Sequence, residues 1–298
     1  METRCKYPEW TRGQVEALLN IIGEENARKL LVGEISVELR ETMEKFFDKN
    51  DRRIPKGLLD SVCDANKDFR LSQPKMEIVA DYEVYLRRLH ECLGDTGITP
   101  EQLKRESEKL WAEIQENPQI ANITNGVGLP VVLPKLTTSD LGTALEQYLE
   151  AVGGSYSKTF SGRSFNNYRK GELSGNVSIV AGSKHDQLIS RMKEGPVIGI
   201  HFPNPLQGFS INASREQMST LPEGFVLSGM DTAIAMAMYP DILACDWKTP
   251  GLDLAALQWQ SAGYSLYFRA GDDRLGFDRT DDLTYAGGYY SGGLLFLG

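Results

Sequence analysis

Histidine and cysteine are scarce in this chain of 298 residues, which has three histidines and four cysteines. The cysteines (Cys5, Cys63, Cys92 and Cys245) are far apart in sequence, so the spacing of a zinc ribbon or a redox pair is missing. A catalytic zinc ion needs about three protein ligands, which three scattered histidines do not readily supply. We therefore predict free thiols, no metal site and no cofactor.

Long hydrophobic runs are also missing. The most apolar stretches, residues 233–238 and 294–297, are too short to cross about 30 Å of hydrocarbon. The opening residues, METRCKYPEW, contain charges and a proline where a secretory signal needs an apolar core. We expect a soluble protein of the cytoplasm that does not bind membranes.

Basic residues are outnumbered by acidic ones. The chain has 32 Lys and Arg against 41 Asp and Glu, which gives a formal net charge of −9. Nucleic-acid binding needs a basic surface that neutralises phosphates. We therefore do not expect DNA or RNA as the main partner.

The signature motifs of common enzyme classes are absent. The chain has no G-x-S-x-G elbow, no H-E-x-x-H, no Walker loop and no complete G-x-G-x-x-G. Residues 228–232 (SGMDT) follow an apolar run and are similar to a pyrophosphate loop that is one glycine short. A helix N-cap explains the same residues more simply.

The first 125 residues are predicted to be mainly helical, beginning with a small helix–helix–strand unit over residues 1–45. Thr11 and Gln14 fit a capping box, a second short helix covers residues 24–31, and residues 35–39 alternate like a strand. Helices are also predicted over residues 56–69, over residues 76–93, and from Thr99-Pro100 onward.

Residues 126–298 are predicted to form an α+β domain. A helix beginning near Thr138 or Ser139 is expected to end at Gly153-Gly154, and a helix over residues 214–220 is expected after a strand over residues 208–211. Strands and helices do not alternate regularly. The predicted fold class is α+β, with a helical N-terminal half followed by a mixed, largely antiparallel sheet with short helices.

The chain ends in an apolar segment, residues 292–298 (GGLLFLG). Such an end predicts a paired and buried strand rather than a frayed tail. The alternative is that this apolar end binds another protein.

Residues 153–175 carry a local excess of positive charge in an acidic chain. Four basic residues stand against one acid, Glu172, and they are Lys158, Arg163, Arg169 and Lys170. Arginines with nearby hydroxyl and amide donors suit a phosphate or carboxylate. The simpler interpretation is a solvated surface loop.

Two histidines are candidates for proton transfer. His185 stands in the first turn of a predicted helix, and His201 is expected at the end of a strand, before a rigid turn that holds Asn204 between two prolines. The simpler interpretations are a surface turn for His185 and a structural X-Pro turn for His201.

Five aspartates are concentrated in residues 271–282 (GDDRLGFDRTDD). Oxygen-rich clusters can bind calcium, but the spacing is not that of an EF-hand. A solvated hairpin loop is the favoured interpretation.

Three stretches, residues 51–59 (DRRIPKGLL), 201–209 (HFPNPLQGF) and 254–261 (LAALQWQS), resemble uncharacterised predicted proteins of Parcubacteria-like candidate-phylum bacteria. The opening unit is similar to an N-terminal module that recurs in such proteins. The resemblance implies no known activity and no catalytic residue.

Two functions stay open, and the sequence does not decide whether the chain is an enzyme. The first is a non-catalytic binding or interaction protein with a site for an anionic small molecule. The second is a hydrolase or transferase acting on a phosphorylated or carboxylated small molecule. In that enzyme, Arg163 and Arg169 would hold the anion, with Lys158, Lys170 and Asn204 nearby, and His185 or His201 would move a proton.

Overall fold

The computed structural model describes residues 22–36, 44–57, 60–65, 67–69, 71 and 81–298. The chain separates into two compact units, Met1–Met43 and Glu44–Gly298. In the first unit, helix α2 (Glu24–Leu31) confirms the predicted short helix. It has acids in its first turn and Arg28 and Lys29 in its last turn, which complements the helix dipole. The predicted capping box at Thr11 and Gln14 and most of the strand at residues 35–39 lie outside the described residues.

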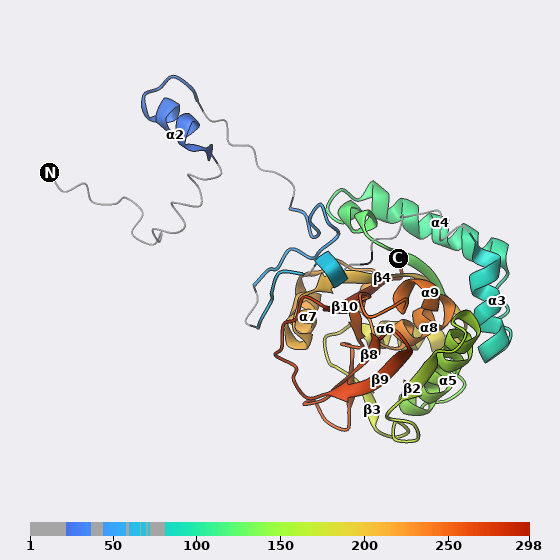
Figure 1. Ribbon diagram of the computed structural model, residues 1–298. Coiled ribbons are helices and arrows are strands. Elements are labelled where there is room, and N and C mark those ends of the chain that lie inside the picture. Colours follow the sequence, from blue (N-terminus) through green and yellow to red (C-terminus); the bar gives the residue numbers. More distant parts are fainter. Residues whose placement is uncertain (1–21, 37–43, 58–59, 66, 70, 72–80) are drawn as a thin grey trace. The chain divides into compact units, whose positions relative to one another are not determined.

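The second unit is built around an eight-stranded mixed sheet with the order β1-β4-β10-β6-β8-β9-β2, to which β5 adds by pairing with β10 (Figure 1). Two neighbouring pairs, β6–β10 and β2–β9, are parallel. The strands of this sheet are β1 (Leu129–Leu133), β2 (Ser164–Asn167), β4 (Val197–Gln207), β5 (Phe225–Leu227), β6 (Gly251–Asp253), β8 (Ser265–Ala270), β9 (Arg274–Thr280) and β10 (Tyr290–Phe296). A separate two-stranded sheet pairs β3 (Val177–Ile179) with β7 (Leu257–Trp259).

The C-terminal strand β10 lies inside the sheet, where it pairs with β4, β5 and β6. Its apolar residues Leu294, Leu295 and Phe296 are buried. The predicted paired and buried strand at the end of the chain is therefore confirmed, and these side chains are already covered by the chain's own core.

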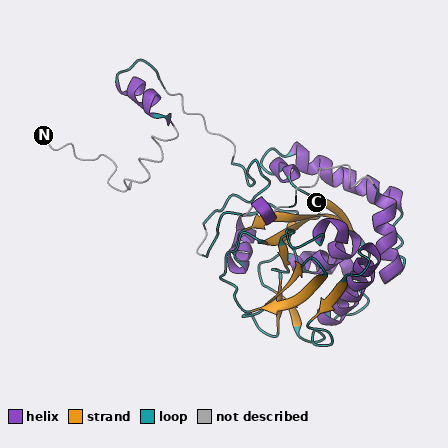
Figure 2. Cartoon of the chain, viewed as in Figure 1, coloured by secondary structure: helices purple, strands orange, loops and turns teal. Residues whose placement is uncertain are grey.

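Helices cover this sheet (Figure 2), and α3 and α4, labelled in Figure 1, run along the outside of the unit. Tyr85 of α3 packs on Tyr239, with ring centroids 4.2 Å apart. Trp111 of α4 meets Phe202 of β4 edge to face at 5.6 Å. The helices of this unit are α3 (Tyr82–Leu93), α4 (Pro100–Glu116), α5 (Leu141–Thr159), α6 (His185–Glu194), α7 (Ile211–Gln217), α8 (Met230–Met238) and α9 (Pro240–Leu243). No helix in the described ranges is both long and apolar enough to cross a membrane.

The predicted fold class is wrong. The chain is mixed α/β: helices of the N-terminal region are followed by a large sheet that begins at β1, and further helices, including the 19-residue α5, lie among its strands. The apolar faces of α3 and α4 are buried against α5, α8 and β4, so they do not form a helical half of their own. The predicted helix over residues 56–69 is also wrong, since its described residues hold only the short 3-10 turn Lys67–Phe69.

The glycines at positions 153 and 154 do not end α5. A Cβ atom on Gly153 would lie 3.0 Å from Phe165, and one on Gly154 would lie 3.3 Å from the Cys92 sulfur. These glycines therefore allow β2 and α3 to approach the helix closely, and α5 continues to Thr159.

Strand β4 corrects the prediction around His201. The strand runs for 11 residues through both Pro203 and Pro205, so His201 lies in its interior and not at its end. The partner register on β10 shifts between Gly292 and Leu294, opposite these prolines, where their missing N–H groups interrupt the ladder least. The strand predicted at residues 208–211 is also wrong: Gly208 lies in a turn, Phe209 forms an isolated bridge with Val62, and α7 begins at Ile211. This helix is capped by Ser210 and not by Ser214.

Candidate functional site

The structure brings two of the predicted site residues, His185 and His201, to the start of α8. His201 Nδ1 lies 2.8 Å from Asp231 Oδ2, and the Ser228 hydroxyl lies 3.4 Å from the same nitrogen. His201, Asp231 and Ser228 have no exposed surface. Burial alone would raise the pKa of Asp231, but the hydrogen bond with His201 and the Gly229 N–H lower it.

His185 is held in one tautomer by the backbone around α8. The Met230 N–H donates to His185 Nε2 at 3.2 Å, so Nδ1 carries the proton and donates to the Leu227 carbonyl at 3.0 Å. Burial lowers the pKa of this imidazole, which keeps it neutral. Both ring nitrogens are therefore used to join α6 to the β5–α8 connection.

These residues do not form a hydrolytic triad, although serine, histidine and aspartate are all present. In a triad the serine and the carboxylate contact different nitrogens of the imidazole. Here Ser228 and Asp231 both face Nδ1, and Nε2 has no hydrogen-bond partner among the described residues. Since all three groups are also buried, we assign this histidine cluster (His185, His201, Ser228 and Asp231) to the packing of the core.

The predicted anion-binding side chains are engaged elsewhere. Lys158 pairs with Glu91 at 2.8 Å on the surface. Arg163 lies over the ring of Phe160 and donates to the carbonyl of Cys245.

Arg169 donates to Asp278 at 2.8 Å and to Glu172 at 3.1 Å. Lys170 lines a hollow on α5 and β2 together with Glu146 and Glu150. Asn204 is buried in β4, and neither atom of its amide group has a partner in the described part of the chain. None of the contacts described for these residues involves His185 or His201.

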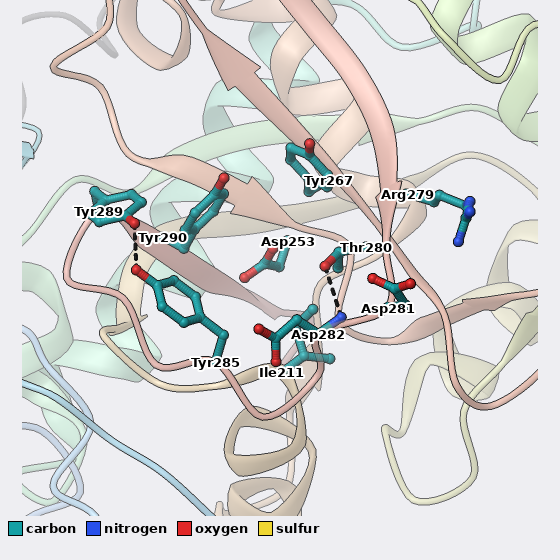
Figure 3. Close-up of a pocket in the computed structure, with 10 residues that line it drawn as sticks. All are labelled: Ile211, Asp253, Tyr267, Arg279, Thr280, Asp281, Asp282, Tyr285, Tyr289 and Tyr290. Carbon is teal, nitrogen blue, oxygen red and sulfur yellow. Dashed lines mark hydrogen bonds between the residues drawn. The ribbon is translucent and has the colours of Figure 1, made fainter.

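A cavity of about 310 Å³ lies at the end of β6, the end of β9 and the start of β10, beside Tyr267 of β8 (Figure 3). Its wall contains four tyrosines, three aspartates, an arginine, a threonine and an isoleucine. These residues are Tyr267, Tyr285, Tyr289, Tyr290, Asp253, Asp281, Asp282, Arg279, Thr280 and Ile211. We call this cavity the Asp253 cleft.

Asp253 is the last residue of β6, and its carboxyl lies in the middle of the residues drawn in Figure 3. The residue is 5% exposed, and no hydrogen bond or ion pair from the described residues reaches its carboxyl oxygens. Burial raises the pKa of Asp253 to about 8, although the charge of nearby Arg215 opposes the shift. Arg215 donates to the carbonyls of Ala255 and Leu257, so it does not pair with the carboxyl directly.

The tyrosines form a continuous aromatic wall. Ring centroids are 5.9 Å apart for Tyr267 and Tyr290, 5.1 Å for Tyr289 and Tyr290, and 6.2 Å for Tyr285 and Tyr289. Arg269 donates to the Tyr290 hydroxyl at 3.0 Å, and the Tyr285 and Tyr289 hydroxyls contact each other. Burial raises the pKa values of Tyr267 and Tyr290, so these side chains stay neutral at physiological pH.

The opposite side of the cleft follows strand β9. The Asp282 N–H donates to Thr280 Oγ1 at 3.2 Å, which shapes this turn. The guanidinium of Arg279 lies 4.5 Å from the ring centroid of Tyr264, which is not part of the cleft. Figure 3 shows this guanidinium directed away from the four tyrosines that line the cleft. Of the aspartate-rich stretch predicted as a hairpin loop, Asp272 and Asp273 lie in the turn between β8 and β9, whereas Asp281 and Asp282 line the cleft.

Sequence reasoning missed Asp253 because one aspartate between leucines resembles no motif. Two signals were available: a lone acid in the apolar run 252–257, and the dense tyrosines of residues 285–290 (YAGGYY). The described residues contain no group of three or more His, Cys, Asp or Glu side chains placed to hold a metal ion. No family model matches the chain, and neither a curated protein nor a solved structure matches it.

Proposed function

We propose that this chain is a binding protein for a small organic molecule, which it holds in the Asp253 cleft. The observation that carries the proposal is a buried carboxyl without an ion pair in the wall of a cavity. A buried and unpaired carboxyl costs stability, and such groups are typical of sites where a ligand supplies the missing partner.

The composition of the wall supports this function. Tyrosine combines a rigid apolar ring with a hydroxyl, so it can stack on a ligand and also form a hydrogen bond with it. A cavity of about 310 Å³ falls at the lower end of the usual range for ligand pockets, which favours a molecule of metabolite size. The proposal keeps the predicted binding function but moves it to residues that the sequence analysis did not name.

The predicted anionic ligand is not favoured in this cleft, because three aspartates line it. An anion remains a proposal only for the basic side chains of residues 153–175. There, Arg169 is already neutralised by Asp278 and Glu172.

Thermal unfolding of the full chain with a panel of small molecules tests the binding function. The panel should contain organic cations, neutral polyols, and carboxylates or phosphates at millimolar concentration. A ligand at about 100 times its Kd adds about 2.7 kcal/mol, which raises the Tm by about 5 °C or more. We expect at least one class to give such a shift.

Two matched variants locate the binding site. Tyr285 and Tyr168 are both about half exposed, at 46% and 50%, but only Tyr285 lines the Asp253 cleft. Tyr285→Ala should reduce the ligand-induced shift, whereas Tyr168→Ala should keep it. The proposal is wrong if no class raises the Tm, or if the shift survives unchanged in both Tyr285→Ala and Asp253→Asn.

One observation favours a second candidate function, a hydrolase with Asp253 as general acid. With a pKa of about 8, this carboxyl is protonated at neutral pH and could donate a proton to a leaving group. A panel of chromogenic glycosides and esters tests this activity. Turnover that declines above pH 8 and is lost in Asp253→Asn would support the hydrolase, and turnover that Asp253→Asn leaves unchanged would exclude Asp253 from the reaction.

A further inference from the structure

We infer that the Asp253 cleft binds an organic cation, a small molecule with an ammonium group held between tyrosine rings and carboxylates. The inference rests on the proposed binding function and adds the charge of the ligand. It starts from the acidic side chains of the cleft. No ion pair within the described residues involves Asp253, Asp281 or Asp282, although all three line one cavity.

The tyrosine rings are inclined to one another and do not form a flat platform. The interplanar angles are 85° for Tyr267 and Tyr290, 46° for Tyr289 and Tyr290, and 55° for Tyr285 and Tyr289. Rings at such angles present several faces and edges to one volume. This arrangement suits a compact cation, which is attracted to the negative faces of aromatic rings, better than it suits a planar ligand.

The same rings already bind one cation within the chain. The guanidinium carbon of Arg269 lies 5.5 Å from the ring centroid of Tyr289 and 5.6 Å from that of Tyr290. Arg279 makes a similar contact with Tyr264 and Trp259, outside the tyrosine wall. The positive charges near the cleft therefore have aromatic or carbonyl partners. The Thr284 hydroxyl donates to Asp282 at 3.2 Å, and no ion pair of the described residues neutralises the three aspartates, so their charge is available to a cationic ligand.

Binding of a cation should be linked to loss of the Asp253 proton. The titratable and charged groups around Asp253 are Arg215 on α7, Tyr267 and Arg269 on β8, Arg279 on β9, Asp281 and Asp282 after β9, Tyr285 in the following loop, and Tyr289 and Tyr290 at β10. Burial lowers the pKa of Arg215 only to about 10 and raises the pKa values of Tyr267 and Tyr290. These three groups keep their charge state between pH 6 and 9, so the pH dependence in this window comes from Asp253.

The sign of this dependence separates a cation from a neutral ligand. A cation binds the ionised carboxyl, so its affinity should rise about tenfold per pH unit up to pH 8 and then level off. A neutral ligand that accepts a hydrogen bond from the protonated carboxyl should bind less tightly as the pH rises above 8.

Isothermal titration calorimetry of the full chain with choline tests the inference. Choline keeps its charge at every pH, and 3,3-dimethylbutan-1-ol is its neutral isostere. We expect choline to bind about 50-fold more tightly at pH 8 than at pH 6, because the ionised fraction of a carboxyl with a pKa of about 8 rises by that factor. The isostere should bind at least tenfold more weakly than choline at pH 8. Asp253→Asn should weaken choline binding at least tenfold and remove its pH dependence, while Tyr168→Ala should leave both unchanged.

Three results would overturn the cationic ligand: no binding of choline or tetramethylammonium, equal affinity for choline and its isostere, or an affinity for choline that falls between pH 6 and 8. If neutral polyols still bind in any of these cases and Tyr285→Ala weakens them, the proposed binding function survives without the cation. If no compound of any charge binds, both proposals are wrong.

Discussion

Asp231 and Asp253 are both buried aspartates of the second unit, but their carboxyl groups differ in their hydrogen-bond partners. Asp231 accepts from the Gly229 N–H with one oxygen and lies against His201 Nδ1 with the other. The carboxyl of Asp253 has no hydrogen-bonding partner in the described chain and faces a cavity. Their pKa values accordingly move apart, downward for Asp231 and to about 8 for Asp253. Both carboxyl oxygens of Asp231 thus have partners within the chain, whereas the carboxyl of Asp253 is available to form hydrogen bonds or an ion pair with a ligand.

The largest expected difference in stability is between the two variants in which one of these aspartates is replaced by asparagine. Asparagine has one acceptor oxygen and one donor group, so at position 231 it cannot satisfy both Gly229 and His201. We expect Asp231→Asn to lower the free energy of unfolding by about 2–3 kcal/mol, because it leaves a buried donor without an acceptor. Asp253→Asn should change it by less than about 1 kcal/mol at pH 6, since the carboxyl there is already neutral.

Urea denaturation of both variants at pH 6 measures this difference. Equal losses of stability in the two variants would show that the two carboxyls do not differ as described.

The ionisation of Asp253 should make the stability of the chain depend on pH. Its pKa is higher in the folded chain than in the unfolded chain, so between about pH 4 and 8 the folded state holds the extra proton and stability falls as pH rises. At about 1.4 kcal/mol per pH unit, the wild-type chain should lose about 3 kcal/mol relative to Asp253→Asn between pH 5.5 and 7.5.

Denaturation of both proteins at several pH values gives this difference directly. Parallel curves for wild type and Asp253→Asn over the whole range would mean that Asp253 titrates at an ordinary pKa.

The tight packing of the histidine cluster provides a further contrast. A Cβ atom on Gly293 would lie 2.8 Å from the Ser228 hydroxyl and 3.0 Å from His201 Cε1. Gly293→Ala should therefore cost about 1–3 kcal/mol through overpacking. Gly263 is the control, because its nearest neighbour would be 3.7 Å away, and Gly263→Ala should be close to neutral. Thermal unfolding of both variants checks this, and an equal Tm would show that the cluster has room to move.

The smallest effect on stability is expected at the rim of the cleft. Tyr285→Ala and Tyr168→Ala both remove half-exposed rings, so each should change the free energy of unfolding by about 0.5 kcal/mol. Their difference should show only when a ligand is present. A large loss of stability in Tyr285→Ala alone would assign the tyrosine wall a structural role.

Much of the local structure could be predicted from the sequence. The helix predicted from Thr99-Pro100 onward is formed as α4, because its cap at Thr99 and its proline at the first position act only through neighbouring residues. The apolar C-terminal strand is also found where its composition placed it. By contrast, the predicted end of α5 was wrong. Its two glycines allow the close approach of Phe165 and Cys92, and such a tertiary contact leaves no local signal in the sequence.

The candidate site could hardly be predicted from the sequence, because it is formed almost entirely by tertiary contacts. His185 and His201 were recognised as a pair, but their burial against α8 could not be derived from their neighbours in sequence. Asp253 joins Tyr267, Tyr290 and Asp281 only because β6, β8, β9 and β10 come together in the sheet. A parallel pairing of β6 with β10 across nearly 40 residues leaves no periodicity that sequence analysis can detect.

The most direct test of this account is the titration of Asp253 itself. The carbon-13 chemical shift of its side-chain carboxyl, assigned by its loss in Asp253→Asn, can be followed from pH 4 to pH 10. The contrast between the two aspartates predicts a midpoint near pH 8 that moves lower when a cationic ligand is added. A midpoint near pH 4 would contradict it.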